Sequence, residues 1–272
     1  MTAIALTIAG SDSSGGAGIQ ADLKAFSALG AYGASVITAL TAQNTLGVQG
    51  VFPVSPAFVR QQMDSVFGDL AVGAVKIGML GTAEVIAAVA DGLERWRPRW
   101  IVLDPVMVAK SGDKLLADEA VDALRTRLLP LASLITPNLP EAGVLLGAPA
   151  ATTRCEMGAV AARLQGLGAR DVLLKGGHLE GSESPDLLLH GGERYWLEGE
   201  RVPTRRTHGT GCTLSAAITA LLARGLPLPS AVAGAKRYLA GAIVAADKLG
   251  VGQGHGPVHH FHQLWPHLGD QP

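Results

Sequence analysis

Short apolar runs alternate with helix-like segments along the whole chain, and this alternation limits the folds that the sequence can adopt. The runs have the length of strands buried on both faces, as in a parallel sheet. Strands are expected at residues 3–9, 34–40, 51–54, 74–79, 100–103, 134–136 and 171–175, with an antiparallel hairpin of 186–190 and 193–197. Helices are expected at residues 23–29, 55–67, 82–96, 117–129, 153–167, 214–222 and 230–249, and another opens at 137–141. This order predicts a mostly parallel, doubly wound α/β sheet.

The composition narrows the range of partners. Of the 272 residues, 48% are hydrophobic and 17% charged, enough for one large α/β domain or two small ones. A formal net charge of −1 without a basic stripe argues against a nucleic-acid partner. No apolar run is long enough to cross a bilayer, and the N-terminus lacks a basic signal region. Cys155 and Cys212 have no metal-ligand spacing and suggest no disulfide framework; this fits a reducing cytosol, so we expect a cytoplasmic protein.

A glycine-rich turn, Gly209-Thr210-Gly211, stands directly before one of the expected helices. Glycines let backbone N–H groups converge on one point, and the helix dipole adds positive potential there. The turn therefore predicts an anion site, most suitably for a phosphoryl group. Cys212 follows in the first turn of the helix, where the pKa of a thiol is lowered. The alternative is a small buried cysteine behind an ordinary turn.

Polar residues follow most of the expected strands. In a doubly wound sheet, ligands bind beyond the carboxyl ends of the strands. The groups expected to converge there are Gly10-Ser11-Asp12, Gln43-Asn44, Met79, Asp104, Asn138 with Glu141, Lys175 and the turn 209–212. This convergence predicts a binding site more strongly than any one of the motifs does.

Two acidic motifs are compatible with a magnesium site. Asp104 ends an apolar run, where a carboxylate needs a cation or hydrogen-bond donors; it can equally cap the loop 108–113. Asn138 and Glu141 lie three residues apart at a helix start. They suit the hydration shell of Mg²⁺, although ordinary helix capping explains them too.

The remaining motifs are weaker. The glycine-rich segment Gly15-Gly16-Ala17-Gly18 does not have dinucleotide-binding spacing, and the chain has no phosphate loop of the Walker type. Lys175 ends a strand, where it can reach phosphate or simply face solvent. His208 is expected to be structural rather than a base. The tail histidines resemble a metal cluster only loosely, and a flexible or packed C-terminus is expected: His255, His259, His260, His262 and His267.

Taken together, the motifs resemble a known family. They are Ala9-Gly10-Ser11-Asp12-Ser13-Ser14-Gly15-Gly16-Ala17-Gly18-Ile19-Gln20-Ala21-Asp22, Thr41-Ala42-Gln43-Asn44, Lys76-Ile77-Gly78-Met79-Leu80, Asp104-Pro105-Val106-Met107, Thr136-Pro137-Asn138-Leu139-Pro140-Glu141, Leu174-Lys175-Gly176-Gly177-His178 and His208-Gly209-Thr210-Gly211-Cys212. In this order, the chain resembles the hydroxymethylpyrimidine/phosphomethylpyrimidine kinases of the ribokinase-like superfamily. Most of that superfamily has aspartate where Cys212 stands; cysteine resembles these kinases and certain related pyridoxal kinases.

The resemblance implies a fold and an activity. The fold is a ribokinase-like three-layer α/β/α sandwich with a mostly parallel central sheet, at most a small lid, and one domain over residues 1–272. The activity is the ATP- and Mg²⁺-dependent phosphorylation of 4-amino-5-hydroxymethyl-2-methylpyrimidine and then of its monophosphate, in thiamin diphosphate biosynthesis. We also expect a homodimer. The alternatives are a pyridoxal or pyridoxine kinase with a cysteine base and a non-catalytic pyrimidine-binding protein; a thiol hydrolase is remote.

The resemblance also implies roles for particular residues. The pyrimidine would be bound by Gly10, Asp22, Gln43, Met79 and Val106. The anion hole would be formed by Gly209, Thr210 and Gly211, with Cys212 as the catalytic base. ATP would be bound by Lys175, Asn138 and Thr207, and the metal by Asp104 and Glu141. The chain departs from the family in its tail, where His259-His260 replaces Asn-His, and this puts the tail's contacts in question.

Overall fold

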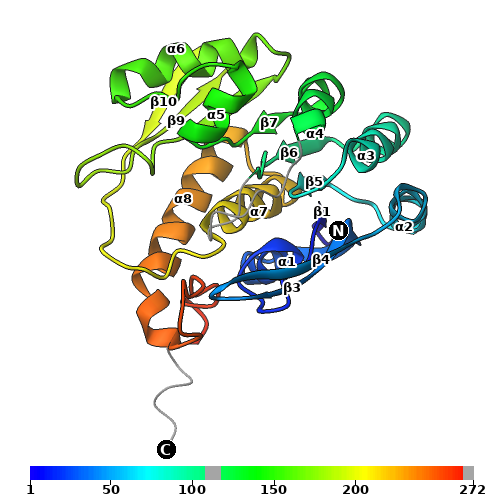
Figure 1. Cartoon of the computed structure of the whole chain (residues 1–272), viewed down its shortest axis with the longest axis horizontal. Coiled ribbons are helices and arrows are strands. Elements are labelled where there is room, and N and C mark those ends of the chain that lie inside the picture. Colours follow the sequence, from blue (N-terminus) through cyan, green and yellow to red (C-terminus); the bar gives the residue numbers. More distant parts are fainter. Residues whose placement is uncertain (108–117, 266–272) are drawn as a thin grey trace, which may run out of the picture.

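A central sheet of eight strands organises the part of the chain that the computed structural model describes, residues 1–107 and 118–265 (Figure 1). Its strands are β1 (Ile4–Ala9), β2 (Tyr32–Ile37), β5 (Ala74–Ile77), β6 (Trp100–Leu103), β7 (Leu134–Ile135), β8 (Asp171–Lys175), β9 (Asp186–His190) and β10 (Glu193–Leu197). They lie in the order β10-β9-β8-β7-β6-β5-β1-β2. Pairing is parallel from β2 to β8, and β9 and β10 form the antiparallel edge. The predicted mostly parallel sheet and its terminal hairpin are confirmed.

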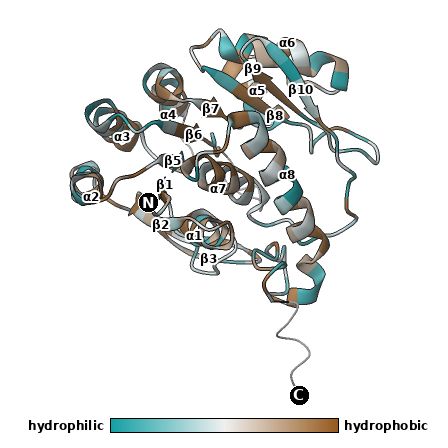
Figure 2. Ribbon diagram, turned by 180° about the vertical axis from the view of Figure 1, so that it is seen from behind, coloured by the Kyte–Doolittle hydropathy of each residue, from teal (hydrophilic) through white to brown (hydrophobic). Residues whose placement is uncertain are grey.

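Helices cover both faces of this sheet. They are α1 (Gly18–Ala28), α2 (Pro56–Asp69), α3 (Ala83–Trp96), α4 (Asp118–Ala123), α5 (Leu139–Leu146), α6 (Arg154–Gln165), α7 (Thr210–Ala223) and α8 (Leu228–Val244). One apolar core joins the sheet to α2 through α6, and a second joins its other face to α1, α7 and α8. Strands β6 and β7, buried between these layers, are coloured as hydrophobic in Figure 2. The three-layer α/β/α arrangement is therefore confirmed.

Helix starts follow the signals in the sequence. The Ser55 side chain accepts the backbone N–H of Phe58 at 3.3 Å, directly before Pro56 begins α2. At the start of α6, the Glu156 carboxylate accepts the backbone N–H of Thr153 at 2.9 Å. The helix expected at 117–129 is interrupted: α4 passes into a π-helical turn at 124–128 and a 3₁₀ turn at 129–131. The latter contains Pro130, whose nitrogen cannot donate to a helical ladder.

The strand expected at 34–40 is wrong at its end. β2 stops at Ile37, and the chain continues into a separate hairpin of β3 (Ala39–Asn44) and β4 (Gly47–Pro53). Thr38, the residue between β2 and β3, is buried. It forms hydrogen bonds with the end of β1 and with the segment after β5. Its N–H donates to Ala9 O at 3.0 Å and its hydroxyl to Met79 O at 2.7 Å. These bonds turn the chain away from β2, and the hairpin forms a small flap beside the main sheet (Figure 1).

The described part of the C-terminal tail is packed, as one of the two sequence-based alternatives predicted. His255 N donates to Thr45 O, at the tip of the β3–β4 hairpin, at 2.9 Å. His260 Nε2 lies 3.0 Å from the Thr213 hydroxyl of α7. His267 lies outside the described residues. Within residues 1–107 and 118–265 no group of His, Cys, Asp or Glu has the arrangement of a metal site, and no helix could span a membrane.

The buried imidazole of His260 predicts a loss of stability in acid. Burial lowers its pKa to about 3, helped by nearby Lys24 and His259. Between about pH 6.5 and 3 the unfolded chain therefore binds a proton that the folded protein does not, and stability falls as the pH falls. His260→Gln keeps a hydrogen-bond acceptor without the titration. Urea unfolding at pH 7 and pH 5 should show a smaller drop for this variant than for the parent; an equal drop would contradict the assignment.

Candidate active site

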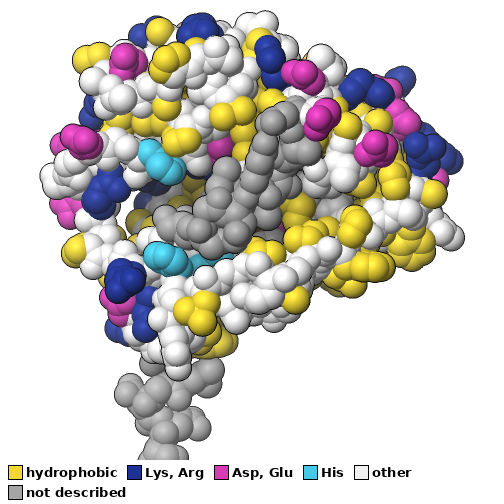
Figure 3. Space-filling view, viewed as in Figure 1, with side chains coloured by type: hydrophobic (Ala, Val, Ile, Leu, Met, Phe, Trp, Pro, Cys, Tyr) yellow, Lys and Arg dark blue, Asp and Glu magenta, His cyan; other side chains and the backbone are white. Residues whose placement is uncertain are grey.

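A cavity of about 1180 Å³ opens at the carboxyl ends of the parallel strands. Figure 3 shows the hollow beside histidine side chains on the surface. All but one of the residues assigned to the site from the sequence line this cavity: Gly10, Gln43, Met79, Asp104, Val106, Asn138, Glu141, Lys175, Thr207, Gly209, Thr210, Gly211 and Cys212. Segments far apart in the sequence thus meet where the sheet topology predicts.

Asp22 is the exception, and its expected place on the cavity wall is wrong. It lies on the side of α1 that faces the sheet and is completely buried. Its Oδ2 accepts the Thr7 hydroxyl at 2.6 Å and pairs with Lys76 Nζ at 2.8 Å. Lys76, not Asp22, reaches the cavity. The sequence carried one sign of this: a lysine inside the otherwise apolar strand 74–79 needs a buried partner.

The Lys76–Asp22 pair has no contact with solvent. Burial alone would lower the pKa of Lys76, but the carboxylate of Asp22 outweighs this effect and raises it above its ordinary value. Burial raises the pKa of Asp22, and Lys76 opposes that rise. A positive charge therefore stands at the floor of the cavity, near Cys212.

The glycine-rich turn has the predicted conformation. Gly209 is the N-cap of α7 and has a φ of 76°, in the left-handed region that favours glycine. A Cβ atom at Gly209 would lie 1.9 Å from the backbone oxygen of Gly16, so the turn touches the glycine-rich loop after β1. Thr210, Gly211 and Cys212 in the first turn of α7 line the cavity, and a helix N-terminus at this place suits an anion.

Asp12 holds the loop after β1 against this turn. Its Oδ2 accepts the backbone N–H of Gly16 at 3.1 Å and of Ala17 at 2.8 Å, and lies 2.8 Å from His208 Nε2. Burial would raise the pKa of Asp12, but hydrogen bonds from His208 and Ser14 lower it to about 2. The expected structural role of His208 is thereby confirmed.

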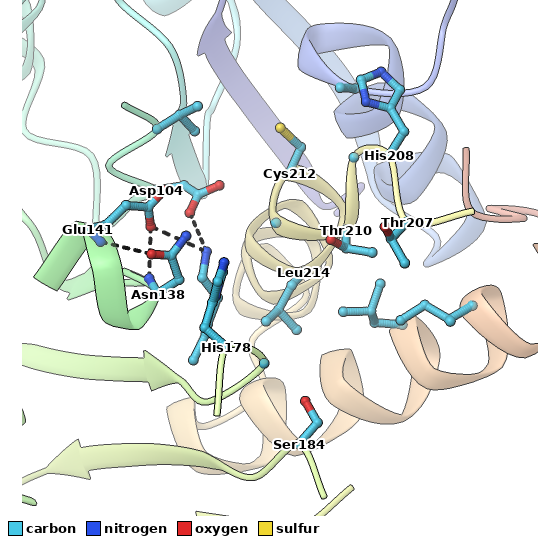
Figure 4. Close-up of a pocket in the computed structure, with 18 of the residues that line it drawn as sticks. Asp104, Asn138, Glu141, His178, Ser184, Thr207, His208, Thr210, Cys212 and Leu214 are labelled. Atoms are coloured by element: carbon cyan, nitrogen blue, oxygen red, sulfur yellow. Dashed lines mark hydrogen bonds and ion pairs between the residues drawn. The ribbon is translucent and has the colours of Figure 1, made fainter. Parts of the chain in front are cut away.

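Two carboxylates and one lysine form a cluster on the other side of the turn (Figure 4). Asp104 Oδ1 lies 3.0 Å from Lys175 Nζ and accepts the Thr136 hydroxyl at 3.0 Å. Glu141 Oε2 lies 4.0 Å from the same Nζ. Asn138 and Glu141 also form a complete capping box, with both bonds at 2.8 Å. The capping alternative is therefore correct, and Glu141 still faces the cavity.

The pKa values of the two carboxyl groups in this cluster shift in opposite directions. Burial raises the pKa of Glu141 to about 7; Lys175 opposes the rise and Asp104 adds to it. Burial acts in the same direction on Asp104, but Lys175 and Lys76 outweigh it and lower the pKa of that carboxyl. The Asp104 carboxylate likewise raises the pKa of Lys175, against the effect of burial. Because the two carboxylates share the single ammonium group of Lys175, the cluster can accept a further cation.

The expectation that the pKa of the Cys212 thiol is lowered is wrong. Burial raises its pKa to about 11, and although Lys76 favours the thiolate, the carboxylates of Asp22 and Asp104 oppose it. The Cys212 side chain points toward the cavity from the first turn of α7 (Figure 4). The helix terminus is therefore only one influence on the thiol, and nearby buried carboxylates counteract it.

One wall of the cavity was not predicted from the sequence. It is formed by α8 and by the irregular segment before the turn, and includes Val202, Lys236, Arg237, Leu239, Ala240 and Ile243. The apolar positions of α8 have the same pattern as core positions, so periodicity could not separate them.

A turn that gathers N–H groups for an anion, next to carboxylates suited to a hard cation, serves the transfer of a phosphoryl group. The fold and the site thus define an α/β kinase of the ribokinase-like type. The chain belongs to the phosphomethylpyrimidine kinase family, whose model matches residues 12–259.

Individual relatives agree with this family. The chain is 60% identical to the hydroxymethylpyrimidine/phosphomethylpyrimidine kinase of Rhizobium meliloti (strain 1021), over 97% of this chain and 99% of that protein. It is 56% identical to the enzyme of that name from Escherichia coli (strain K12), over 96% and 98%. Among solved structures, an ADP complex of Bacillus subtilis pyridoxal kinase is 40% identical, with a TM-score of 0.87 over 97% of this chain and 100% of that one. Phosphomethylpyrimidine kinase from Clostridium difficile 630 is 45% identical, with a TM-score of 0.79 over 88% and 98%.

Gly209 and Gly225 offer a matched test of the anion turn, because both flank α7 with positive φ. A methyl group at Gly225 would meet only open space, so Gly225→Ala should lose only the roughly 1–2 kcal/mol of left-handed strain. In Gly209→Ala, the added methyl group also collides with the Gly16 oxygen. Urea unfolding should therefore show a clearly larger loss of stability for this variant, and its turnover should fall as well. Equal losses in the two variants would show that the contact with the loop after β1 is unimportant.

Proposed function

We propose that this protein transfers the γ-phosphoryl group of ATP to 4-amino-5-hydroxymethyl-2-methylpyrimidine, and then phosphorylates the monophosphate, in thiamin diphosphate biosynthesis. The observation that carries the proposal is one continuous cavity that contains the anion turn, the Asp104–Lys175 cluster and Cys212. The names of the relatives support the substrate. We further propose that residues 1–272 act as one domain, in a cytoplasmic homodimer.

The pyrimidine is assigned to the end of the cavity near Gly10, Gln43, Met79 and Val106. Gln43 is held through its backbone: its N–H donates to the Ser13 hydroxyl at 2.9 Å, and its carbonyl accepts from that hydroxyl at 2.8 Å. Its amide can donate and accept together, which matches a ring nitrogen beside an exocyclic amine. Asp22 supports this end indirectly, through Lys76.

ATP is assigned to the remaining part of the cavity. Complexes of the Staphylococcus aureus pyridoxal kinase with AMP-PCP support the use of ATP by proteins of this fold. Lys175 would neutralise phosphate charge, and Asn138 and Thr207 would contact the phosphates from opposite walls. The apolar side chains of α8, with Leu239 and Ile243, would accept the base.

The donor set of the acidic cluster fits Mg²⁺. This ion takes one or two protein carboxylates together with phosphate oxygens and water. Asp104 and Glu141 provide two carboxylates at the cavity, and Glu141 Oε2 is the oxygen used for capping, so the Oε1 atom is available. A bound Mg²⁺ ion would neutralise charge on the phosphates.

In the reaction, the substrate hydroxyl oxygen attacks the γ-phosphorus, and the bond to the bridging oxygen of ADP breaks with its electron pair. The hydroxyl proton passes to the thiolate form of Cys212, which becomes the thiol. The N–H groups of the turn 209–211 stabilise charge on the phosphoryl group during transfer, and Lys175 does so from the other side. Because these donors are already fixed by the contact with Gly16, little reorganisation is needed.

Cys212→Ala should retain affinity for ATP and pyrimidine, whereas turnover falls by about 10²–10⁴-fold, the usual contribution of a general base. Since the pKa of the thiol is about 11, the parent's turnover should rise with pH from neutral upward as the thiolate fraction grows. That rise should be absent in Cys212→Ala.

Cys155→Ser serves as the control, because Cys155 is exposed at the start of α6. It should match the parent in turnover and pH profile. Near-parental turnover in Cys212→Ala would remove the base role and leave Cys212 as packing behind the turn.

Asp104→Asn and Glu141→Gln should raise the Mg²⁺ concentration needed for half-maximal rate more than they alter the KM for pyrimidine. Glu156→Gln is a matched control, because Glu156 has the same place in a capping box, outside the cavity. If Glu141→Gln reproduces Glu156→Gln, with lower stability and an unchanged Mg²⁺ requirement, Glu141 is a capping residue only.

The proposed function is tested by incubating the protein with Mg-ATP and the hydroxymethylpyrimidine, and measuring products by mass. Formation of both mono- and diphosphate with ADP supports it, and ligand binding without ADP formation contradicts it. Pyridoxal and pyridoxine belong in the same assay, because pyridoxal kinases that are 36–40% identical share the fold with TM-scores of 0.86 to 0.89. Faster turnover of these vitamers would favour the second candidate, a pyridoxal-type kinase.

A further inference from the structure

One exposed arginine holds an entire loop of the cavity wall. Arg201 Nη1 donates to Gly177 O at 2.9 Å, Nε to Gly181 O at 2.9 Å, and Nη2 to Leu179 O at 2.6 Å and Glu183 O at 3.4 Å. The four carbonyls belong to alternate residues, so the loop curls around the guanidinium. A guanidinium has five N–H donors, and these bonds occupy four of them.

The loop concerned connects β8 to β9 and begins directly after Lys175. Gly177, His178 and Ser184 line the cavity from it, and Figure 4 shows His178 and Ser184 on this wall. The loop contains no regular helix or strand, but its last part is held by the backbone of the segment before the turn. Ser184 N donates to Gly199 O at 2.8 Å, and Arg201 N to Ser182 O at 2.7 Å.

The base of the same loop is anchored separately. Asp186 Oδ1 accepts the N–H of Gly176 at 2.9 Å, and its Oδ2 pairs with Lys236 of α8 at 2.6 Å. A Cβ atom at Gly176 would lie 2.0 Å from Pro185 O, so the two ends of the loop are in contact. Since the ends are fixed in this way, Arg201 determines the conformation of the middle.

The direction of the carbonyls matters for the ligand. A carbonyl oxygen is the negative end of the peptide dipole, and carbonyls turned into the cavity would repel the phosphates of a nucleotide. Arg201 draws four of them to itself. Its planar fork can do this, whereas the single nitrogen of a lysine cannot reach all of them.

We propose that Arg201 is a positioning residue for the nucleotide: it turns four carbonyls of the 177–183 loop toward its guanidinium and so keeps the wall beside Lys175 suited to an anion. This inference rests on the proposed use of ATP. It predicts a selective effect, because none of the residues assigned to the pyrimidine belongs to this loop or bonds to Arg201.

The test compares Arg201→Met, Arg201→Lys and a control, Arg170→Met. Arg170 also has an exposed guanidinium with partners, lying over Trp100 and 3.5 Å from Asp171, but it does not line the cavity. Calorimetry measures the Kd for AMP-PCP with Mg²⁺, and separately the Kd for hydroxymethylpyrimidine; thermal unfolding measures the Tm. Arg201→Met should weaken AMP-PCP binding by about tenfold, the effect of one or two net hydrogen bonds, and leave the pyrimidine Kd within about twofold of the parent.

Arg201→Lys should bind AMP-PCP with intermediate affinity, and Arg170→Met like the parent. An unchanged Kd for AMP-PCP in Arg201→Met overturns the inference. If both ligands bind more weakly by the same factor and the Tm falls in parallel, the inference is also overturned, because that pattern indicates a purely structural role. If Arg201→Met does not fold, Arg201→Lys decides: parental affinity for AMP-PCP then contradicts the need for the fork.

Failure of this inference differs from failure of the proposed function. If the parent forms no ADP with the pyrimidine, the proposed kinase activity is wrong, whatever the variants bind. If the parent is active and Arg201→Met binds AMP-PCP as the parent does, only the role of Arg201 is wrong.

Discussion

The site depends on one buried carboxylate, Asp12, which binds the loop after the first strand to the turn before α7. These two segments lie 196 residues apart, and Asp12 and His208 meet at 2.8 Å. Around this contact the backbones approach so closely that Gly209 has no room for a side chain. The N–H groups of the turn are therefore held by the packing of two loops, and the anion site has little freedom to deform when phosphate charge moves within it.

A second constraint is electrostatic. Lys76 and Lys175 are both surrounded by protein and are each paired with a carboxylate, Asp22 and Asp104. Each pair offsets the cost of placing charge away from water. Cys212 stands between these pairs, so its thiol senses both signs of charge. Binding of phosphate and of the proposed metal ion would change that balance, which would link the chemistry of the thiol to the ligands in the cavity.

The sequence was sufficient for features that depend on local pattern or on topology. Capping residues such as Ser55 and the length of apolar runs predicted most helices and strands, and the rule for carboxyl ends of strands brought the site residues together. The sequence was insufficient where a contact with a distant segment determines the local structure. The end of β2 depends on Thr38 bonding to two neighbouring segments, and the place of Asp22 depends on Lys76 from another strand. The prediction for the pKa of Cys212 was wrong for the same reason, because burial and remote carboxylates act against the helix terminus. The role of Arg201 was invisible, since its partners are backbone oxygens, which carry no sequence signal.

The packed tail has a consequence for the order in which the protein can be completed. The backbone N–H of His208 donates to Gly256 O at 3.1 Å, and the residues that follow bond to α7 and α8. During synthesis the N-terminal strands emerge first, yet the turn that completes the site is supported by residues 255–260, which are synthesised long after those strands. Until then, the glycine-rich loop after β1 lacks its partner. A nascent chain can thus build much of the sheet while its catalytic centre is still unformed, and ligands that require the finished turn bind only after residues 255–260 have been synthesised.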